Sequence, residues 1–447
     1  MGKEVRIDDL FEIEKGSLQS SKSINGKYNF ITAAEAWKTH ESFSHNTEAL
    51  VFAAAASGSL GRTHYVNGKF IASDLCFILT PKDLNKYYVD LKFYHFVFNN
   101  LREQIVKATK TGTSKDSINI TNFSNYEIPY IQKFQQIEWI EKLKKTERIQ
   151  NELLRKSVQQ EDFLHKLRQS ILQEVVQGKL TKQDPKDEPA EKLLQRIKAE
   201  KQKMIAAGKL KKEKELPPIT EDEIPYKLPN GWVWCRLGEL VLKSEAGKSL
   251  VCEKRKAEFP EWGIVKVSAM SWGEFDENES KVLPKDISPT LEYKILKGDY
   301  LISRANTDEL IGKSVIVGDI KSNLLLSDKS IRIVFSEFVS KVFINLFNNS
   351  LIAREYYKSV ATGTSNSMKN ISREQMYMMP VPFPPLSEQQ RIVAKVEHLM
   401  QIANQLEQQV QQSKEQAQQL LQAVLKEAFT NKRQYEENDV ITMAAEQ

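Results

Sequence analysis

The run Thr111-Gly112-Thr113-Ser114 occurs a second time in this chain, as Thr362-Gly363-Thr364-Ser365. The two copies are 251 residues apart, and at that spacing eight of the nineteen positions from 111 to 129 are identical. Self-similarity at a fixed distance is the signature of a duplicated structural unit. We therefore predict two related globular regions, each with one copy of this run close to its end.

The beginnings of the two regions also match, but at a different spacing. Arg6-Ile7-Asp8-Asp9-Leu10 is similar to Arg236-Leu237-Gly238-Glu239-Leu240, which lies 230 residues further on. Upstream of the repeated run, Phe98-Asn99-Asn100 matches Phe347-Asn348-Asn349. Because the spacing grows from front to back, the second copy carries extra residues in its middle. Matching ends around a divergent middle predict a shared scaffold with variable loops.

A long helical stretch follows each region. The second begins after Pro384-Pro385, where we expect a capping box made by Ser387 and Gln390. Its apolar residues follow the three–four rhythm of a coiled-coil seam: Ile392, Val396, Leu399, Ala403, Leu406, Val410, Ala417, Leu420 and Val424. The first stretch, about residues 134–176, is looser. Each is roughly 65 Å long at 1.5 Å per residue.

Neither helix is stable alone in water, so each needs a partner. We expect the two helices to pair antiparallel with each other and to hold the two regions at opposite ends. A coiled coil from another protein is the alternative partner. Strand-like runs and amphipathic helical segments alternate inside each region, which predicts an α+β fold.

The resulting division of the chain has six parts. A charged linker with a short helix at residues 190–207 joins the first helix to the second region. Its basic tract, residues 209–212, is expected to be solvated, and a contact with phosphate is the alternative. The predicted boundaries are 1–130 for the first region, 131–178 for the first helix, 179–227 for the linker, 228–385 for the second region, 386–430 for the second helix and 431–447 for a flexible tail.

Bulk composition is that of a globular protein in a reducing compartment. Hydrophobic residues make up 40% of the chain and charged residues 28%, and the net charge is +5. That charge is compatible with nucleic acid binding. No apolar run approaches the roughly 20 residues that cross a bilayer, and residues 1–6 lack an apolar signal core. The three cysteines form no CxxC pair, which favours the cytoplasm and argues against a zinc module.

The sequence shows no pattern typical of a catalytic centre. Gly247-Lys248-Ser249 and Gly312-Lys313-Ser314 end like phosphate-binding loops, but the first glycine of that motif is replaced by Leu242 and by Thr307. Without it the turn that aims backbone N–H groups at phosphates is not expected. The six histidines show no metal-ligand spacing. These patterns favour a binding protein over an enzyme.

Three stretches resemble the specificity subunits of Type I restriction–modification systems. They are Gly178-Lys179-Leu180-Thr181, the run from Leu228 to Glu239, and Met379-Pro380-Val381-Pro382-Phe383-Pro384-Pro385 with the Leu386–Val393 segment that follows it. The resemblance covers nearly the whole chain. Two features depart from the family pattern: Ile128–Phe134 lacks the proline-rich form, and the first region has no tryptophan-rich opening.

The resemblance implies that each region is a target-recognition domain for one half of a split double-stranded DNA site. It implies that the helices act as a ruler and dock two modification (methyltransferase) subunits, which bind S-adenosylmethionine. It also implies restriction subunits that use ATP and Mg²⁺ to translocate and cleave DNA. On this interpretation the chain is a non-catalytic cytoplasmic subunit that binds no cofactor. A coiled-coil adaptor joining two protein-binding domains, or a diverged DNA methyltransferase or nuclease, remains an alternative.

Candidate DNA contacts lie on loops rich in small, polar and basic residues, because small residues let backbone N–H groups approach phosphate. Arg62 and Arg304 are the candidates for base readout, since Arg is bidentate to guanine, and Arg62→Ala is expected to relax or abolish recognition of one half-site. The repeated run is either a structural turn or a backbone contact, because a residue shared by both regions cannot read two sequences. The full set is Ser59, Gly61, Arg62, His64, Thr113, Ser114, Lys115, Arg304, Asn306, Lys313, Thr364, Ser365, Asn366 and Lys369.

Overall fold

Two units make up the structure, a computed structural model of the 447-residue chain. The structure describes residues 3–56, 58–111, 117–212, 214–271, 273–363 and 368–430. The predicted tail, 431–447, lies outside them. One unit comprises residues 1–160 and 409–447, and the other comprises residues 161–408. Each unit therefore holds one globular region together with part of α5 (Lys133–Val176) and part of α11 (Leu386–Thr430).

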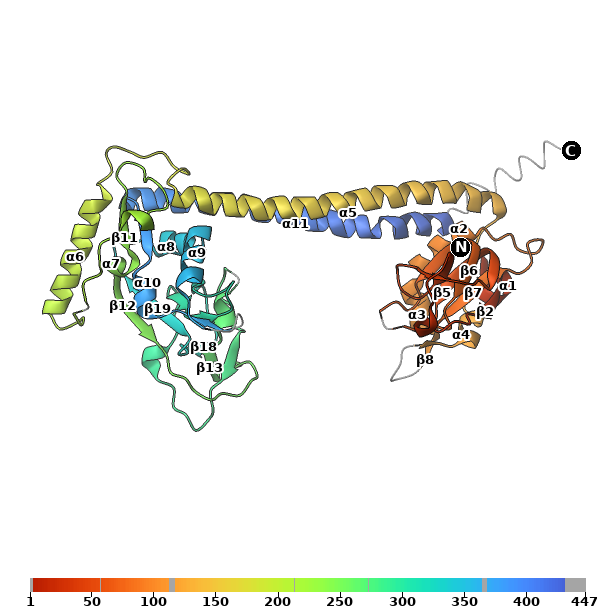
Figure 1. Cartoon of the computed structure of the whole chain (residues 1–447), viewed down its shortest axis with the longest axis horizontal. Helices are drawn as coiled ribbons and strands as arrows, with labels where there is room; N and C mark the ends of the chain where they lie inside the picture. Colours follow the sequence, from red (N-terminus) through yellow and green to blue (C-terminus); the bar gives the residue numbers. More distant parts are fainter. Residues whose placement is uncertain are drawn as a thin grey trace. The chain divides into compact units, whose positions relative to one another are not determined.

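The globular region of the first unit is built on a mixed six-stranded sheet with the strand order β2-β7-β5-β6-β3-β4 (Figure 1). Its elements are β1 (Lys3–Arg6), α1 (Ile7–Leu10), β2 (Phe11–Lys15), the 3₁₀ turn η1 (Ser20–Lys22), β3 (Tyr28–Ile31), β4 (Lys38–His40), β5 (His45–Ala53), β6 (Thr63–Ala72), β7 (Cys76–Pro81), α2 (Leu91–Asn100), α3 (Arg102–Thr109), β8 (Lys110–Thr111), β9 (Ser117–Ile118), α4 (Ile120–Asn125) and β10 (Glu127–Tyr130).

The sheet of the first unit has a buried core on each face. Successive side chains of a strand point to opposite faces, so in β5 the residues Leu50 and Phe52 enter one core while Val51 enters the other. The helix α2 packs on the larger core, and the Asp90 carboxylate caps its N-terminus by accepting from the backbone N–H of Lys92 at 2.8 Å. This packing fixes the end of β5, where the candidate site begins.

The second unit has a four-stranded sheet, β12-β19-β15-β17, and a three-stranded sheet, β14-β13-β18 (Figure 1). Its elements are α6 (Ala190–Ala206), η2 (Glu221–Glu223), β11 (Val233–Arg236), α7 (Leu237–Leu240), β12 (Val241–Ala246), β13 (Trp262–Val265), η3 (Val267–Met270), β14 (Ser280–Val282), η4 (Leu291–Tyr293), β15 (Tyr300–Ser303), β16 (Ala305–Asn306), β17 (Ser314–Ile316), β18 (Asn323–Leu325), β19 (Ser330–Phe335), α8 (Lys341–Asn348), α9 (Leu351–Val360), β20 (Lys369–Asn370), α10 (Arg373–Tyr377) and β21 (Pro380–Phe383).

In both units the first strand pairs antiparallel with the last strand before the long helix begins. Arg6 of β1 lies opposite Glu127 of β10, and Arg236 of β11 lies opposite Pro380 of β21. Positions that play the same part at the back of the two regions are therefore 253 residues apart. The ungapped spacing of 251 that the sequence suggested up to position 129 is wrong by two residues after the repeated run.

The two long helices pair antiparallel within each unit, as predicted. In the first unit the beginning of α5 and the end of α11 share the larger core, where Leu143 and Leu425 are buried. The Gln150 amide donates to the carbonyl oxygen of Ala417 at 2.9 Å. In the second unit the end of α5 meets the beginning of α11, and Arg168 forms an ion pair with Glu407 at 2.9 Å.

The predicted seam of α11 is confirmed over most of the helix. Ile392, Val396, Ala403, Val410 and Ala417 are buried, whereas Leu406 is 42% exposed, and near the helix end Leu425 is buried in place of Val424. An α-helix drifts by about 20° per heptad against a strict seven-residue repeat. The predicted rhythm is therefore wrong only at Leu406 and in the last turns.

The predicted bounds of α11, 386–430, are confirmed, but the predicted capping box of Ser387 and Gln390 is wrong. The helix begins at Leu386, and the carbonyl oxygen of Pro385 already accepts the first helical hydrogen bond from the N–H of Gln389 at 2.9 Å. Ser387 therefore lies inside the first turn instead of capping it. The predicted end of α5 is confirmed, because Gly178 has a φ of +64° and the N–H of Lys179 donates to the carbonyl of Glu174.

The linker between the first helix and the second region contains the predicted helix, α6, and its basic tract at residues 209–212 is mostly exposed, as expected. Helix α6 buries Ala190, Leu193 and Ile197 in the largest core of the second unit. Apolar residues that recur every three or four positions place one face of a helix against a core, so the charged residues on α6 mark only its outer face.

Candidate nucleic-acid interface

The predicted residues Ser59, Gly61 and Arg62 lie on the turn between β5 and β6, here called the first turn. The N–H of Gly61 donates to the carbonyl of Ala53 at 2.8 Å, and the N–H of Ala53 donates to the carbonyl of Arg62 at 2.8 Å. Gly61 has a φ of +79°, and a Cβ there would lie 2.7 Å from the Val106 side chain. Glycine is required at this position both for its φ and for lack of space.

A turn of the same construction joins β16 to β17 in the second unit, and we call it the second turn. The N–H of Gly312 donates to the carbonyl of Ser303 at 2.8 Å, and the N–H of Ser303 donates to the carbonyl of Lys313 at 2.9 Å. Gly312 has a φ of +71°, and a Cβ there would lie 2.5 Å from the Tyr357 ring. Lys313 thus occupies the position that Arg62 occupies in the first turn.

An asparagine on a helix fastens the strand that leaves each turn. The Asn99 side chain accepts from the N–H of Thr63 at 3.0 Å and donates to the Thr63 carbonyl at 2.9 Å. Asn349 accepts from the N–H of Ser314 at 3.4 Å and donates to the Ser314 carbonyl at 3.0 Å. The sequence match had set Asn99 against Asn348, and this pairing is wrong by one residue.

Backbone contacts hold the strand that follows each copy of the repeated run beside the turn of its own unit. In the first unit the N–H of Ile118 in the β8–β9 hairpin donates to the carbonyl of Ala54 at 2.8 Å. In the second unit the N–H of Ile371 donates to the carbonyl of Arg304 at 2.9 Å, and Asn306 pairs with Lys369 between β16 and β20. Loops that are far apart in sequence therefore form one candidate surface in each unit.

Six of the candidate contacts lie outside the described residues: Thr113, Ser114, Lys115, Thr364, Ser365 and Asn366. Lys369 lies within them, and its ammonium donates to the carbonyl of Gly363 at 2.9 Å. Gly363 has a φ of +124°, and a Cβ there would lie 2.6 Å from the carbonyl oxygen of Met368. Lys369 therefore holds the backbone at Gly363, the second residue of the repeated run in the second unit.

The side chains of the first turn are partly engaged within the protein. Arg62 is 25% exposed and donates to the carbonyl of Ala33 at 3.2 Å and to the Ser59 hydroxyl at 3.3 Å. The Nδ1 atom of His64 accepts from the Trp37 indole at 3.2 Å. Burial lowers the pKa of His64, so the imidazole is mainly neutral at pH 7. His64 therefore packs against the turn and adds no positive charge.

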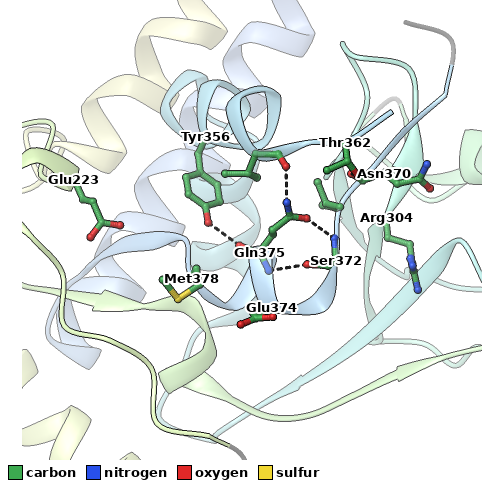
Figure 2. Close-up of a pocket in the computed structure, with 11 residues that line it drawn as sticks. Glu223, Arg304, Tyr356, Thr362, Asn370, Ser372, Glu374, Gln375 and Met378 are labelled. Atoms are coloured by element: carbon green, nitrogen blue, oxygen red, sulfur yellow. Dashed lines mark hydrogen bonds between the residues drawn. The ribbon is translucent and has the colours of Figure 1, made fainter. Parts of the chain in front are cut away.

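Arg304 lies at the edge of a hollow of about 710 Å³ in the second unit (Figure 2). Figure 2 shows its side chain on the same side as Thr362 and Asn370, with Glu223 at the other end. The floor of the hollow is held by Gln375, whose side chain accepts from the N–H of Ser372 at 2.7 Å. Arg304 is partly exposed, and its guanidinium is not among the side-chain donors that hold this floor.

Two arginines behind the turns escaped the sequence analysis. Arg102 of α3 donates to the carbonyls of Leu60 at 2.7 Å and Gly58 at 3.0 Å, so it supports the first turn. Arg354 of α9 is 8% exposed, and within the described parts of the chain none of its three side-chain nitrogen atoms has an acceptor. The sequence signal for Arg354 was that a charged residue stands next to Ala353 and three positions before Tyr357, on a buried helix face.

The described residues contain no group of three or more His, Cys, Asp or Glu side chains placed to hold a metal ion. No helix in the described part of the chain is long and apolar enough to cross a membrane.

The chain is similar to proteins whose names state a role in restriction. A specificity subunit of the Type I restriction enzyme EcoEI from Escherichia coli is 37% identical over 243 residues, 54% of this chain and 41% of the relative. The EcoAI specificity subunit from Escherichia coli is 34% identical over 257 residues, 54% of this chain and 40% of the relative. This chain thus spans about two fifths of the length of these two relatives.

Solved structures share the fold. The HsdS subunit from Thermoanaerobacter tengcongensis gives a TM-score of 0.51 at 17% identity and covers 96% of both chains. A chain from a type I R-M system gives a TM-score of 0.58 at 15% identity, over 96% of this chain and 98% of that one. The family model described as "Type I restriction modification DNA specificity domain" matches residues 2–160 and 229–416. Both globular regions and most of both long helices fall within that match, and the chain therefore belongs to the family of Type I restriction modification DNA specificity domains.

Proposed function

We propose that this chain is the DNA-specificity subunit of a Type I restriction–modification complex, and that each unit contacts one half of a bipartite target. The observation that carries the proposal is the pair of matching turns, each with a cation, Arg62 or Lys313, directly after a left-handed glycine. Two similar surfaces on one chain suit a site with two separate halves, as half-site spacing does for dimeric readers. Genome-wide mapping of methylated adenines in cells that express the chain with its partner subunits tests it.

An ancient duplication accounts for the likeness of the two units. The support is the common pairing of first and last strands, the common turn and the asparagine behind it. The second unit adds residues between β12 and β15, which is where the spacing between matching positions grows. A conserved scaffold with a different middle lets one construction serve two unlike half-sites.

Position within the turn separates contacts with the DNA backbone from contacts with bases. Arg62 and Lys313 are cations at the same position of both turns, so they suit phosphate, which is the same in every sequence. The position before β16 differs between the units. Arg304 takes the place of Ala54, because the carbonyl of each accepts the hydrogen bond from the strand after the repeated run. A residue that differs between two readers of unlike half-sites is the better candidate for base readout, and Arg is bidentate to guanine.

Arg304→Ala is expected to relax one base position in one half-site. Loss of a bidentate contact costs about 1–3 kcal/mol of discrimination, roughly five- to 150-fold in the relative methylation of right and wrong sites. The measurement is methylome mapping with the variant. Arg62→Ala is the matched control. Because Arg62 and Lys313 share one position in the two turns, the sequence-based expectation for Arg62 is replaced, and we expect weaker methylation of all sites with the motif unchanged. Equal loss at all sites for Arg304→Ala would remove it from base readout.

We propose that the modification subunits dock on the long helices, and that these subunits and the restriction subunits bind S-adenosylmethionine, ATP and Mg²⁺, while this chain acts in the cytoplasm without a catalytic site. Exposed apolar side chains on both helices of the second unit support the docking. Phe163 is 68% exposed, Leu167 43%, Ile402 39% and Leu406 42%. Clustered exposed apolar groups mark protein interfaces in folded proteins.

Phe163→Asp is expected to reduce capture of the modification subunits by at least tenfold. An aromatic anchor at the centre of an interface is worth about 2 kcal/mol or more, and a carboxylate there adds the cost of a buried charge. Pull-down from co-expressing cells measures the effect. Gln169→Asp is the control, because Gln169 is also exposed on α5 but lies about 120° around the helix from Phe163, and this variant should capture them normally. Undiminished capture by Phe163→Asp would place the docking surface elsewhere.

A further inference from the structure

Arg354 is a buried charge that the described part of the protein leaves without an acceptor. It is 8% exposed, and its Nε and both Nη atoms are buried and unbonded. Its guanidinium lies 5.4 Å from the centre of the Tyr357 ring, so a cation–π contact compensates part of the loss of water. An unpaired buried charge is costly, and burial lowers the pKa of Arg354. A protein that keeps such a group is poised to bind an acceptor from outside.

The surroundings of Arg354 at the second turn are rich in donors. Gly312, directly before Lys313, lies against the Tyr357 ring over which the Arg354 guanidinium sits, since a Cβ on Gly312 would be 2.5 Å from that ring. Burial, and then the Arg354 charge, lowers the pKa of Lys313. The Nδ2 donor of Asn306, at the start of the same turn, is also buried without an acceptor among the described residues, and Asn306 is 9% exposed. The carboxylate that faces this group, Glu309, is 77% exposed and forms an ion pair with Lys358 at 2.8 Å.

The first turn provides an internal comparison. Behind it, Arg102 donates to the carbonyls of Leu60 and Gly58, so its guanidinium is occupied by the turn itself. Arg354 lies behind the second turn on the corresponding helix but donates to no carbonyl of that turn. The two units thus differ in one respect that matters for binding. The guanidinium behind the second turn has no acceptor among the described residues, whereas the guanidinium behind the first turn is hydrogen-bonded to that turn.

We propose that Arg354, Lys313 and Asn306 form an anion subsite in the second unit that takes one phosphate of the DNA backbone. The inference rests on the proposed function, and it adds a residue, a ligand group and a difference between the two units. Donors without acceptors suit a phosphate, which offers several acceptor oxygens and a negative charge. Because the guanidinium lies below the surface, the second turn shifts when the phosphate enters.

Arg354→Met is expected to be more stable than the wild type but to bind DNA more weakly. Methionine fills similar space and removes an unpaired buried charge, so the melting temperature of the full chain rises. Arg102→Met is the matched control, and its melting temperature falls because two carbonyls lose their donor. A fall for Arg354→Met as well would show that Arg354 is already paired, for example with Glu309, and would overturn the proposal.

Inorganic phosphate probes the subsite without DNA. Raised in place of chloride at constant ionic strength, phosphate should increase the melting temperature of the wild type, because a ligand stabilises the state that binds it. It should have no such effect on Arg354→Met or Lys313→Met. An equal increase in the wild type and both variants would overturn the subsite. This measurement gives its result even if the chain proves not to bind duplex DNA, so the subsite and the proposed function can fail separately.

Duplex binding by the complex with its modification subunits completes the test. The slope of log affinity against log salt falls by about one for each phosphate contact that is lost. We expect Arg354→Met to reduce the slope by about one and to weaken target and non-target duplexes by the same factor. A wild-type slope, or weakening confined to the target sequence, would contradict a phosphate contact.

Discussion

Insertion of one heptad into each long helix is expected to lengthen the spacer of the DNA target by about three base pairs. Seven residues at 1.5 Å each add about 10.5 Å to a helix, and successive base pairs are 3.4 Å apart along each strand of DNA. Suitable points are after Gln160 in α5 and after Gln408 in α11, where both helices pass from one unit to the other. The antiparallel contacts on either side, Gln150 with Ala417 and Arg168 with Glu407, are left intact.

The half-sites themselves should not change, because neither turn is altered. The rotation from seven residues at 3.6 per turn is only about 20°, so the insertion changes the orientation of the helix segments on either side of it very little. Methylome mapping gives the spacer directly. A heptad in α5 alone is the control, and it should abolish methylation because the paired side chains lose register. Methylation at the original spacing by the double insertion would refute the role of the helices in measuring DNA.

Arg236→Leu is expected to destabilise the second unit by about 3–5 kcal/mol, the usual cost of removing one partner of a buried ion pair. The Arg236 side chain is 3% exposed and donates to both carboxylate oxygens of Glu223, at 2.6 and 2.7 Å. It also donates to the carbonyls of Pro217, Pro218 and Met378 at 3.2, 3.1 and 2.6 Å. Leucine leaves four acceptors without a donor and releases the linker from β11.

Denaturant unfolding measures the loss, and the pH dependence identifies its source. Hydrogen bonds from Arg236 lower the pKa of Glu223 from 4.5 to about 2. A lowered folded-state pKa contributes stability above pH 4.5 that is lost as the pH falls toward 2. This loss should be present in the wild type and absent in Arg236→Leu. Arg255→Leu breaks an exposed pair with Glu261 and should have little effect. Similar losses in both variants would show that Arg236 has no special role.

Much of the fold could be predicted because its signals are local. Gly178 ends α5 through a left-handed conformation that other residues rarely adopt, and the apolar spacing from Ile392 to Ala403 identifies a buried stripe. Alternating apolar runs such as residues 330–335 identify strands. Each of these rests on backbone geometry or on a periodicity that is visible within a few residues.

The remaining features depend on contacts between distant residues. Chance identities such as Pro129 with Pro380 outweighed the true register, which only the pairing of β1 with β10 and of β11 with β21 reveals. The charge of the linker hid the apolar face of α6. Arg354 lies on a helix without a motif, and its significance appears only when the acceptors around it are counted. The composition of the loops predicted the two turns, but it did not predict the arginine side chains that lie behind them.

The central claim is that two matching surfaces on one chain read two halves of a DNA site. Mapping of methylated adenines across the genome of cells that express this chain with its modification subunits tests that claim most directly. We predict one motif with two unlike halves, separated by a fixed number of unspecified base pairs and absent when the chain is deleted. A continuous motif, or methylation that does not depend on the chain, would contradict it.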